Sequence, residues 1–449
     1  QAFIPIYSDY EKTNNYSKTN DFLNAVAGTL LFSLFLFTTL VLIFAPIFIL
    51  IFAPGFYFDP IKQDLSVKAL RIMFPYLALI SMVAFTGGIQ NTHQKFSIPA
   101  FTPVIFNLSL IIAAIFVAPK YDMPIYVLAW GVLLAGFIQL LIQIAPLRNI
   151  DRLPIPKFNF NNEGLRKFLI VIFPAILAGG IIQINLLVDT IFASLLETGS
   201  PTWLYVSDRL VQFPMGIFAI AIGTVLLPTL SKLDVSKEKL TFINSIKKGQ
   251  KFVLFIGIPS LIGLMFCAED LISTIFYRGA FTELDVVKSS YSLIAFSFGL
   301  PFFMLMKVLT PAFFARKDTK TPMYVAIISL FLNASLNYLL AFTFGLGHVG
   351  IAIGSSIAAL VSVIILEAIL YKDGFLKMNG IFNKFNLMIL LSSTALIAFL
   401  YIYTSWINFM ELNQIKRVFF LLIEITISIA IYFSISRLVF NRPLKQMFD

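Results

Sequence analysis

Charged residues are scarce in this chain. Asp, Glu, Lys and Arg together make up 12% of its 449 residues, whereas 59% are hydrophobic and the mean hydropathy is +0.89. A soluble domain would carry about 25% charged residues, so this composition excludes an ordinary soluble protein and places the chain in a lipid bilayer.

Cysteine and histidine are nearly absent as well. The single cysteine, Cys267, excludes a disulfide framework and a cysteine-based metal site, and its apolar neighbours predict a packing role. The two histidines, His93 and His348, are predicted to lie in loops far apart in the sequence, which leaves no zinc ligand set.

The sequence also lacks the marks of an enzyme. It has neither a nucleotide-binding glycine loop nor a Ser-His-Asp arrangement in a matching context, and its loops are too short for a soluble catalytic domain. We therefore expect no catalytic residues and no cofactor. The energy for any transport would come from a Na⁺ or H⁺ gradient or from the membrane potential.

What the chain has instead is a series of long apolar runs, each near the roughly 20 residues that a helix needs to cross the hydrocarbon. This pattern predicts an all-α, polytopic membrane transporter with about twelve spans. We place them at 22–50, 67–89, 102–118, 124–145, 168–195, 204–230, 251–276, 287–313, 323–343, 349–371, 385–405 and 417–436.

Lysine and arginine are distributed unevenly between alternate loops. The rich set, which includes the C-terminal tail, contains Lys12, Lys95, Arg152, Lys248, Arg316, Lys372 and Arg437 among many others; the poor set contains few, such as Lys62, Lys120, Arg278 and Lys288. The rich side is predicted to be cytoplasmic, together with the C-terminus. The formal net charge of +10 then indicates topology and contact with anionic membrane lipids rather than nucleic-acid binding.

Two halves of the chain resemble each other at an offset of about 223 residues. The matched positions include Pro5 with Pro228, Gly55 with Gly279, Pro99 with Pro322 and Gly131 with Gly354. An even number of helices separates them, so both copies should have the same orientation in the membrane. The second copy begins near residue 168, so the first would lack about 55 residues, enough for two helices, and the full protein is expected to have about fourteen spans.

This repeat predicts two six-helix lobes. Residues 1–146 would form the N-lobe without its first two helices, residues 147–167 a cytoplasmic linker, and residues 168–371 the C-lobe. Residues 372–449 stand outside the repeat and would form an extra helix pair and a cytoplasmic tail.

Three charges inside the spans are candidates for substrate binding, because a charge in a span is costly unless it is paired or faces water. Arg209 could grip an anion with Asp208 orienting it, since a guanidinium donates bidentate hydrogen bonds to phosphate; alternatively the pair snorkels to the membrane surface. Lys307 should have either a cavity or a carboxylate partner, and its role is either in transport or in structural pairing.

Polar residues in two other spans are candidates for a cation site. Asp189 could bind a cation or proton, or hydrogen-bond a neighbouring helix. Asn333 and Asn337 are one turn apart and share a helix face, where amides either coordinate a cation or join helices. Glu367 and Glu424 lie nearer span ends and are expected to snorkel or pair.

Several segments resemble the MurJ/MviN family, within the larger group of multidrug, oligosaccharidyl-lipid and polysaccharide exporters. They are residues 1–5 (QAFIP), 91–103 (NTHQKFSIPAFTP), 203–210 (WLYVSDRL), 276–282 (FYRGAFT) and 307–322 (KVLTPAFFARKDTKTP). The resemblance covers nearly the whole chain, and it implies two lobes, an extra helix pair forming a lipid-facing groove, and a cationic central cavity.

Such a family member would be a lipid II flippase of the bacterial inner membrane. The resemblance implies that it moves the undecaprenyl-diphosphate-linked peptidoglycan precursor to the periplasmic leaflet by alternating access. Arg209 would be the cavity cation for the diphosphate, and Asp189, Asn333 and Asn337 would fall at a sodium site of some members, where Asn337 replaces an expected carboxylate.

The partners implied are lipid II and membrane lipids, with no nucleic acid. We expect a monomer, and association with the division or elongation machinery stays open. The alternatives are an exporter of another lipid-linked oligosaccharide and a drug/cation antiporter. The basic residues Arg209 and Lys307 argue against a cation exporter.

Overall fold

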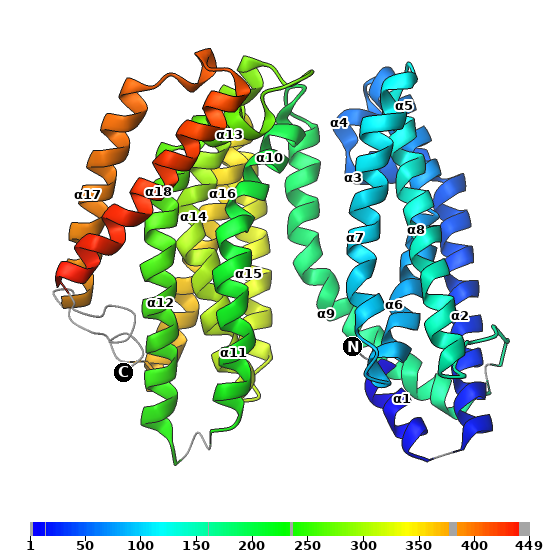
Figure 1. The fold of residues 1–449 in the computed structure, drawn as a ribbon. Coiled ribbons are helices and arrows are strands. Elements are labelled where there is room, and N and C mark those ends of the chain that lie inside the picture. The colour runs from blue at the N-terminus through cyan, green and yellow to red at the C-terminus, as the bar shows by residue number, and fades with distance from the viewer. Residues whose placement is uncertain (1–2, 14, 160, 234–236, 377–383, 440–449) are drawn as a thin grey trace. The chain divides into compact units, whose positions relative to one another are not determined.

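The computed structural model describes residues 3–13, 15–159, 161–233, 237–376 and 384–439, except for the side chains of residues 173–182, 220 and 439. Segment 377–383 and the predicted cytoplasmic tail after residue 439 lie outside the described residues. Within them all regular structure is helical, which confirms the predicted all-α class. The chain forms two compact units, Gln1–Gln183 and Ile184–Asp449 (Figure 1). The predicted boundaries of lobes, linker and extra helix pair stay predictions.

The first unit contains the helices up to the beginning of α9. Their bounds are α1 (Phe3–Lys12), α2 (Tyr16–Ile43), α3 (Ala45–Phe52), α4 (Pro54–Tyr57), α5 (Pro60–Met73), α6 (Tyr76–Thr92), α7 (Ser97–Ile112), α8 (Pro124–Asn149) and α9 (Glu163–Ser194). The second unit begins inside α9. Its further helices are α10 (Ser200–Pro214), α11 (Ile220–Ser231), α12 (Lys239–Phe266), α13 (Ala268–Phe276), α14 (Glu283–Ala315), α15 (Lys320–Asn337), α16 (Gly347–Lys372), α17 (Lys384–Trp406) and α18 (Gln414–Val439).

Eleven helical stretches of the described residues are long and apolar enough to cross a membrane. Each overlaps one of the predicted spans, although the ends of several differ. The remaining predicted span, 168–195, coincides with α9, a helix of 32 residues. The chain is therefore a multi-pass membrane protein, as predicted.

The helices of the two units repeat at the offset found in the sequence. Helix α2 corresponds to α12, α3 to α13, α7 to α15 and α8 to α16, and the two helices of each pair begin 223 positions apart. Helices α5 and α6 together correspond to the continuous helix α14. A π-helical turn follows both α7 (at Ala113–Val117) and α15 (at Tyr338–Thr343), so even this local irregularity is repeated.

Equivalent caps start α5 and α14. The side chain of Asp59 accepts hydrogen bonds from the backbone N–H groups of Ile61 and Lys62, and Pro60 occupies the first helical position. In the second copy Thr282 and Asp285 form a capping box. These side chains satisfy N–H groups that have no partner within the helix, so they fix where both helices begin.

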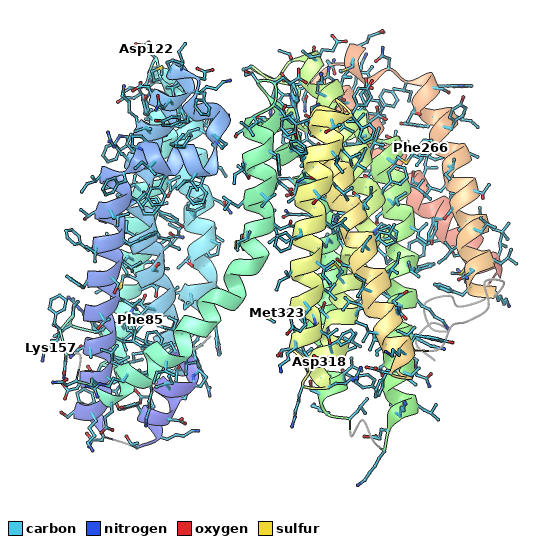
Figure 2. The ribbon with its side chains drawn as sticks, turned by 180° about the vertical axis from the view of Figure 1, so that it is seen from behind. Phe85, Asp122, Lys157, Phe266, Asp318 and Met323 are labelled. Atoms are coloured by element: carbon cyan, nitrogen blue, oxygen red, sulfur yellow. The ribbon has the colours of Figure 1, made fainter. Side chains whose placement is uncertain are left out.

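The basic loops of the first unit meet at one end. The Tyr16 hydroxyl donates to the carbonyl of Asp151 at 3.0 Å, and the Arg152 guanidinium binds Glu11 at 2.6 Å. Figure 2 shows Lys157 near this end and Asp122, from a loop of the basic-poor set, at the other. Alternate loops thus lie at opposite ends of the unit, as spans that cross a membrane in turn require.

The basic loops of the second unit gather in the same way. Arg316 forms an ion pair with Asp373 at 2.7 Å, and its guanidinium lies 4.2 Å from the centre of the Phe375 ring. The Lys239 ammonium lies 4.7 Å from that same ring. Loops before α12, after α14 and after α16 therefore share one end.

The core of the second unit is built around α14 and α16, which pack against each other (Figure 1). The hairpin of α17 and α18 packs on α12 and α13 through a separate apolar cluster that includes Phe255, Met388 and Leu400. This arrangement places the span-bound polar residues of α9, α15 and α16 near one another, away from the hairpin.

Candidate substrate and cation sites

Asp189 is the centre of a polar cluster within the second unit. Its Oδ1 accepts hydrogen bonds from Asn333 Nδ2 at 2.8 Å and from Asn337 Nδ2 at 2.7 Å, and its Oδ2 accepts one from Ser355 Oγ at 3.2 Å. Asn333 Nδ2 also donates to Asn185 Oδ1 at 2.9 Å. Asp189 is thus in direct contact with Asn333 and Asn337, the other two residues that the sequence predicted for a cation site.

Three helices supply this cluster. Asn185 and Asp189 are one turn apart on α9, Asn333 and Asn337 one turn apart on α15, and Ser355 lies in the third turn of α16. Sequence reasoning did not single out Ser355. The signal was a short run of small residues, Gly354 to Ser356, at the start of an otherwise apolar span.

The oxygens of the cluster have the chemistry that hard cations prefer. Asn333 and Asn337 are fully buried, and Asn337 Oδ1 accepts no hydrogen bond from a described residue. A Cβ atom at Gly354 would lie 2.5 Å from that oxygen, so only glycine leaves room for it. A carboxylate, amide oxygens and a hydroxyl make a suitable ligand set. In the arrangement described here, the amide nitrogens hold the Asp189 carboxylate instead.

Arg209 lies on the exposed side of α10. Its guanidinium is 4.7 Å from the centre of the Tyr205 ring, and its Nη1 makes a long 3.5 Å contact with Gln212 Oε1. Gln212 Nε2 in turn donates to Asp208 Oδ2. Asp208 therefore reaches Arg209 through Gln212, without an ion pair between them in the described residues.

The opposite side of α10 is fastened to α14. The Ser207 hydroxyl donates to the carbonyl of Ser289 at 2.7 Å, and Trp203 Nε1 donates to Asp285 Oδ1 at 2.7 Å. Both Ser207 and Trp203 are buried. These contacts fix the rotation of α10, which leaves the Arg209 guanidinium pointing out of the packed helices.

Lys307 is also exposed, in the middle of α14. It forms no ion pair or hydrogen bond with another residue in the described part of the chain. Its backbone carbonyl lies 3.1 Å from where a Cβ atom would stand at Gly223, so α11 packs closely beside it. Of the two surroundings that the sequence predicted for Lys307, the carboxylate partner is not found among the described residues.

Comparisons with known proteins identify the family. A model of the family described as lipid II flippase MurJ matches residues 1–425. The chain belongs to this family. The probable lipid II flippase MurJ of Haemophilus influenzae is 36% identical, over 96% of this chain and 87% of the relative. The lipid II flippase MurJ of Burkholderia cenocepacia is 32% identical, over 83% of this chain and 73% of the relative.

Solved structures agree with this membership. A structure of lipid II flippase MurJ in an inward closed conformation matches with a TM-score of 0.80 and 28% identity, over 98% of this chain and 87% of that one. An inward-facing multidrug resistance transporter of the MATE family matches with a TM-score of 0.57 and 13% identity, which shows the shared fold alone. The resemblance stated from the sequence motifs is confirmed, and this MurJ-family chain is a transporter.

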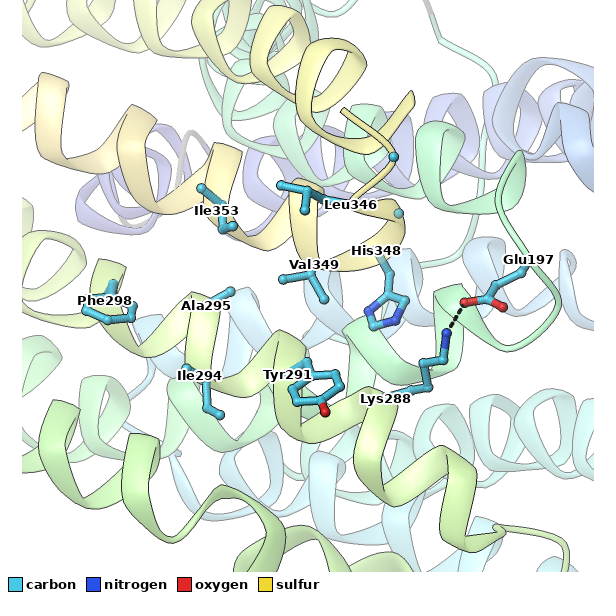
Figure 3. A pocket seen from close by; sticks show the side chains of 12 residues that line it. Glu197, Lys288, Tyr291, Ile294, Ala295, Phe298, Leu346, His348, Val349 and Ile353 are labelled. Carbon is cyan, nitrogen blue, oxygen red and sulfur yellow. Dashed lines mark hydrogen bonds and ion pairs between the residues drawn. The ribbon is translucent and has the colours of Figure 1, made fainter. Parts of the chain in front are cut away.

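A surface pocket of about 580 Å³ lies between α14 and α16 of this MurJ-family chain (Figure 3). The ion pair of Lys288 with Glu197, at 2.7 Å, forms one end of it, and apolar side chains such as Phe298 and Ile353 line the rest. None of the predicted site residues lines this pocket. It is therefore distinct from the Asp189 cluster and from Arg209 and Lys307.

His348 lies at the polar end of this pocket and corrects one prediction. It was expected in a loop, but it lies in the first turn of α16 and is only 3% exposed. Its Nδ1 is hydrogen-bonded to Ser292 Oγ at 2.6 Å, and its ring packs edge-on against Trp203. The short polar run before α16 resembles a loop in sequence, although α10 and α14 bury it.

Proposed function

We propose that this chain moves lipid II, the undecaprenyl-diphosphate-linked peptidoglycan precursor, from the cytoplasmic to the periplasmic leaflet of the bacterial inner membrane by alternating access. Membership of the lipid II flippase MurJ family over residues 1–425 is the observation that carries the proposal. The sugar-peptide head and diphosphate of this lipid need a polar path, whereas its polyprenyl tail can stay in the bilayer.

Arg209 and Lys307 would supply the cationic part of that path. Both are exposed within helices long and apolar enough to cross the membrane. A cation exposed to hydrocarbon at this depth would be costly, so a water-filled surface is the favourable surrounding for each. The planar guanidinium of Arg209 suits bidentate binding of a phosphate, and Lys307 would add a second positive charge for the diphosphate.

The Asp189 cluster would bind the coupling ion, and Na⁺ is the ion that its oxygens suit best. Binding would require the amides of Asn333 and Asn337 to turn their oxygens toward the ion. Because α9, α15 and α16 all contribute ligands, an ion would draw these three helices together. The membrane potential would add about 2.3 kcal/mol per charge moved for each 100 mV.

The proposal also includes the orientation of the chain in the membrane and its oligomeric state. The end of each unit at which the basic loops gather would face the cytoplasm, together with the C-terminus. The chain would act as a monomer, in contact with anionic lipids at this face.

Complementation in living cells tests whether lipid II is the transported substrate. The full-length gene is expressed in cells depleted of their own lipid II flippase, beside Arg209→Ala, Lys307→Ala and the control Lys120→Ala, which removes a basic residue at the end of a membrane-crossing stretch. We expect rescue by the parent and the control and failure of the two span variants at equal expression. Failure of a well-expressed parent would point to another lipid-linked oligosaccharide. Rescue by both span variants would refute the roles given to these two cations.

A further inference from the structure

Two carboxyl groups are buried where α18 packs on α13, and the proposed transport path uses neither. Glu424 on α18 is 0% exposed and Asp270 on α13 is 6% exposed. The two helices are in contact, and each carboxyl lies within electrostatic range of the other. The sequence predicted that Glu424 would snorkel or pair, but its complete burial excludes snorkelling.

Among the described residues, neither carboxyl group forms an ion pair that would balance its charge. Asp270 Oδ2 and Glu424 Oε2 are buried and accept no hydrogen bond from a described residue. Glu424 Oε1 accepts one from the thiol of Cys267 at 3.1 Å. The Arg417 guanidinium, also on α18, donates its hydrogen bonds to the backbone carbonyls of Phe409, Ser273 and Met410.

The other titratable groups around the pair do not supply a positive charge either. Glu269 on α13 adds a further negative charge near Asp270. Tyr403 on α17 is near both carboxyls, and its hydroxyl donates to the carbonyl of Phe420 at 2.9 Å. Two ionised carboxylates in this place would repel each other without solvent to screen them.

A bound proton relieves the repulsion between these two buried carboxylates better than a metal ion does. Protonation removes one charge and turns an acceptor into a donor, so it can satisfy an oxygen that has no partner. Thr274 and Ser428, one turn beyond Asp270 and Glu424, also carry buried hydroxyls without a described partner. Among the described residues no group of three or more His, Cys, Asp or Glu side chains could hold a metal ion.

We propose that Asp270 and Glu424 form a proton-binding site that fastens α18 to α13, with at least one proton held on the pair while the helices are packed. Loss of that proton would place two unscreened negative charges in the interface. The hairpin of α17 and α18 would then separate from α13. The site is independent of the transport path proposed above.

Infrared spectroscopy tests for the proton directly. The purified full chain in lipid nanodiscs at neutral pH should show the carbonyl stretch of a protonated carboxyl, and the double variant Asp270→Asn, Glu424→Gln should lose that band. An unchanged spectrum in the double variant would overturn the proposal.

Thermal unfolding gives a second readout that does not depend on transport. Glutamine mimics a protonated glutamate, so Glu424→Gln should keep the Tm within about 2 °C of the parent at neutral pH. It should also reduce the loss of Tm that the parent shows as the pH rises. The matched control is Glu11→Gln, which removes an ion-paired carboxylate and should lower the Tm. A loss as large in Glu424→Gln as in the control would contradict the proposal, as would a Na⁺-dependent rise in the parent's Tm that Glu424→Gln abolishes.

Discussion

At the scale of single residues, Glu11 shows how the basic end of the first unit is held together. Its carboxylate accepts hydrogen bonds from Arg152 Nε at 2.6 Å and from the Tyr7 hydroxyl at 2.7 Å, and His93 lies beside it at 3.5 Å. Burial opposes ionisation of Glu11, but the hydrogen bonds from Arg152 and Tyr7 outweigh it and lower the pKa of Glu11. Burial, followed by Glu11 itself, raises the pKa of Tyr7.

The lowered pKa makes part of the stability depend on pH. Because the folded-state pKa of Glu11 lies below its unfolded value, near 4.3, the contribution is present above that pH and is lost as the pH falls through the folded value. Glu11→Gln should lower the free energy of unfolding by about 1–3 kcal/mol at neutral pH. It should also weaken the acid dependence below about pH 4. Thermal unfolding over a pH series measures both effects. If the Tm of Glu11→Gln falls with acid as steeply as that of the parent, Glu11 does not cause this pH dependence.

Gly354 gives a residue-scale test of the cation site. A methyl group there would displace the Asn337 amide, since the added carbon would lie 2.5 Å from Asn337 Oδ1. We expect Gly354→Ala to abolish the Na⁺-dependent rise in Tm that binding would give the parent. The control is Ser362→Ala, whose hydroxyl donates only to its own helix at 2.7 Å. An equal Na⁺ response in parent and Gly354→Ala would remove Asn337 from the proposed ligands.

Asp189, Asn333 and Asn337 could be predicted from the sequence as candidates for a cation site, because polar side chains are conspicuous in apolar spans. The sequence could not reveal Ser355, since a serine in a run of small residues looks like helix packing. It also could not pair Glu11 with Arg152, because 141 residues separate them. The link from Arg209 to Asp208 through Gln212 depends on side-chain rotamers, which a sequence does not specify.

At the scale of helices, the apolar runs predicted where spans occur but not where they break. The spans predicted at 22–50 and 251–276 are each two helices, α2 with α3 and α12 with α13, separated at Phe44 and Cys267. These breaks occupy equivalent positions in the repeat. A change of backbone direction inside an apolar run leaves the hydropathy unchanged, so only the structure reveals it.

The packing of one loop on α2 leads to a prediction at this scale. The segment after α8 docks on α2 through hydrogen bonds from Lys157 N to Asn24 O at 3.0 Å and from Ile155 N to Asn24 Oδ1 at 2.7 Å. A Cβ atom at Gly28 would collide with the backbone of Lys157. Gly28→Ala should therefore destabilise the fold by about 1–3 kcal/mol and expose this loop to protease.

Gly263 on α12 provides the control for that change, because an added Cβ there meets nothing within 4 Å. Gly263→Ala should leave both the Tm and the proteolysis pattern near those of the parent. Equal behaviour of the two variants would mean that the loop does not dock at Gly28.

At the scale of the whole molecule, the repeat and the charge asymmetry predicted the architecture better than the site. Equivalent helices start at matching positions in both units, and the basic loops of each unit gather at one end. These features follow from local sequence, since hydropathy, caps and loop charge act over a few residues. The expectation of fourteen spans and the proposed transport path stay predictions.

Transport by the purified protein tests the central claim most directly. The chain is reconstituted in proteoliposomes with labelled lipid II, and the fraction of the lipid exposed on each leaflet is followed over time. We predict transfer by the parent at a rate well above protein-free vesicles, unchanged transfer by Lys120→Ala, and a loss of at least about tenfold in Arg209→Ala, equivalent to about 1.4 kcal/mol in the barrier. Transfer by Arg209→Ala at the parent's rate, or none by a folded parent, would contradict this account.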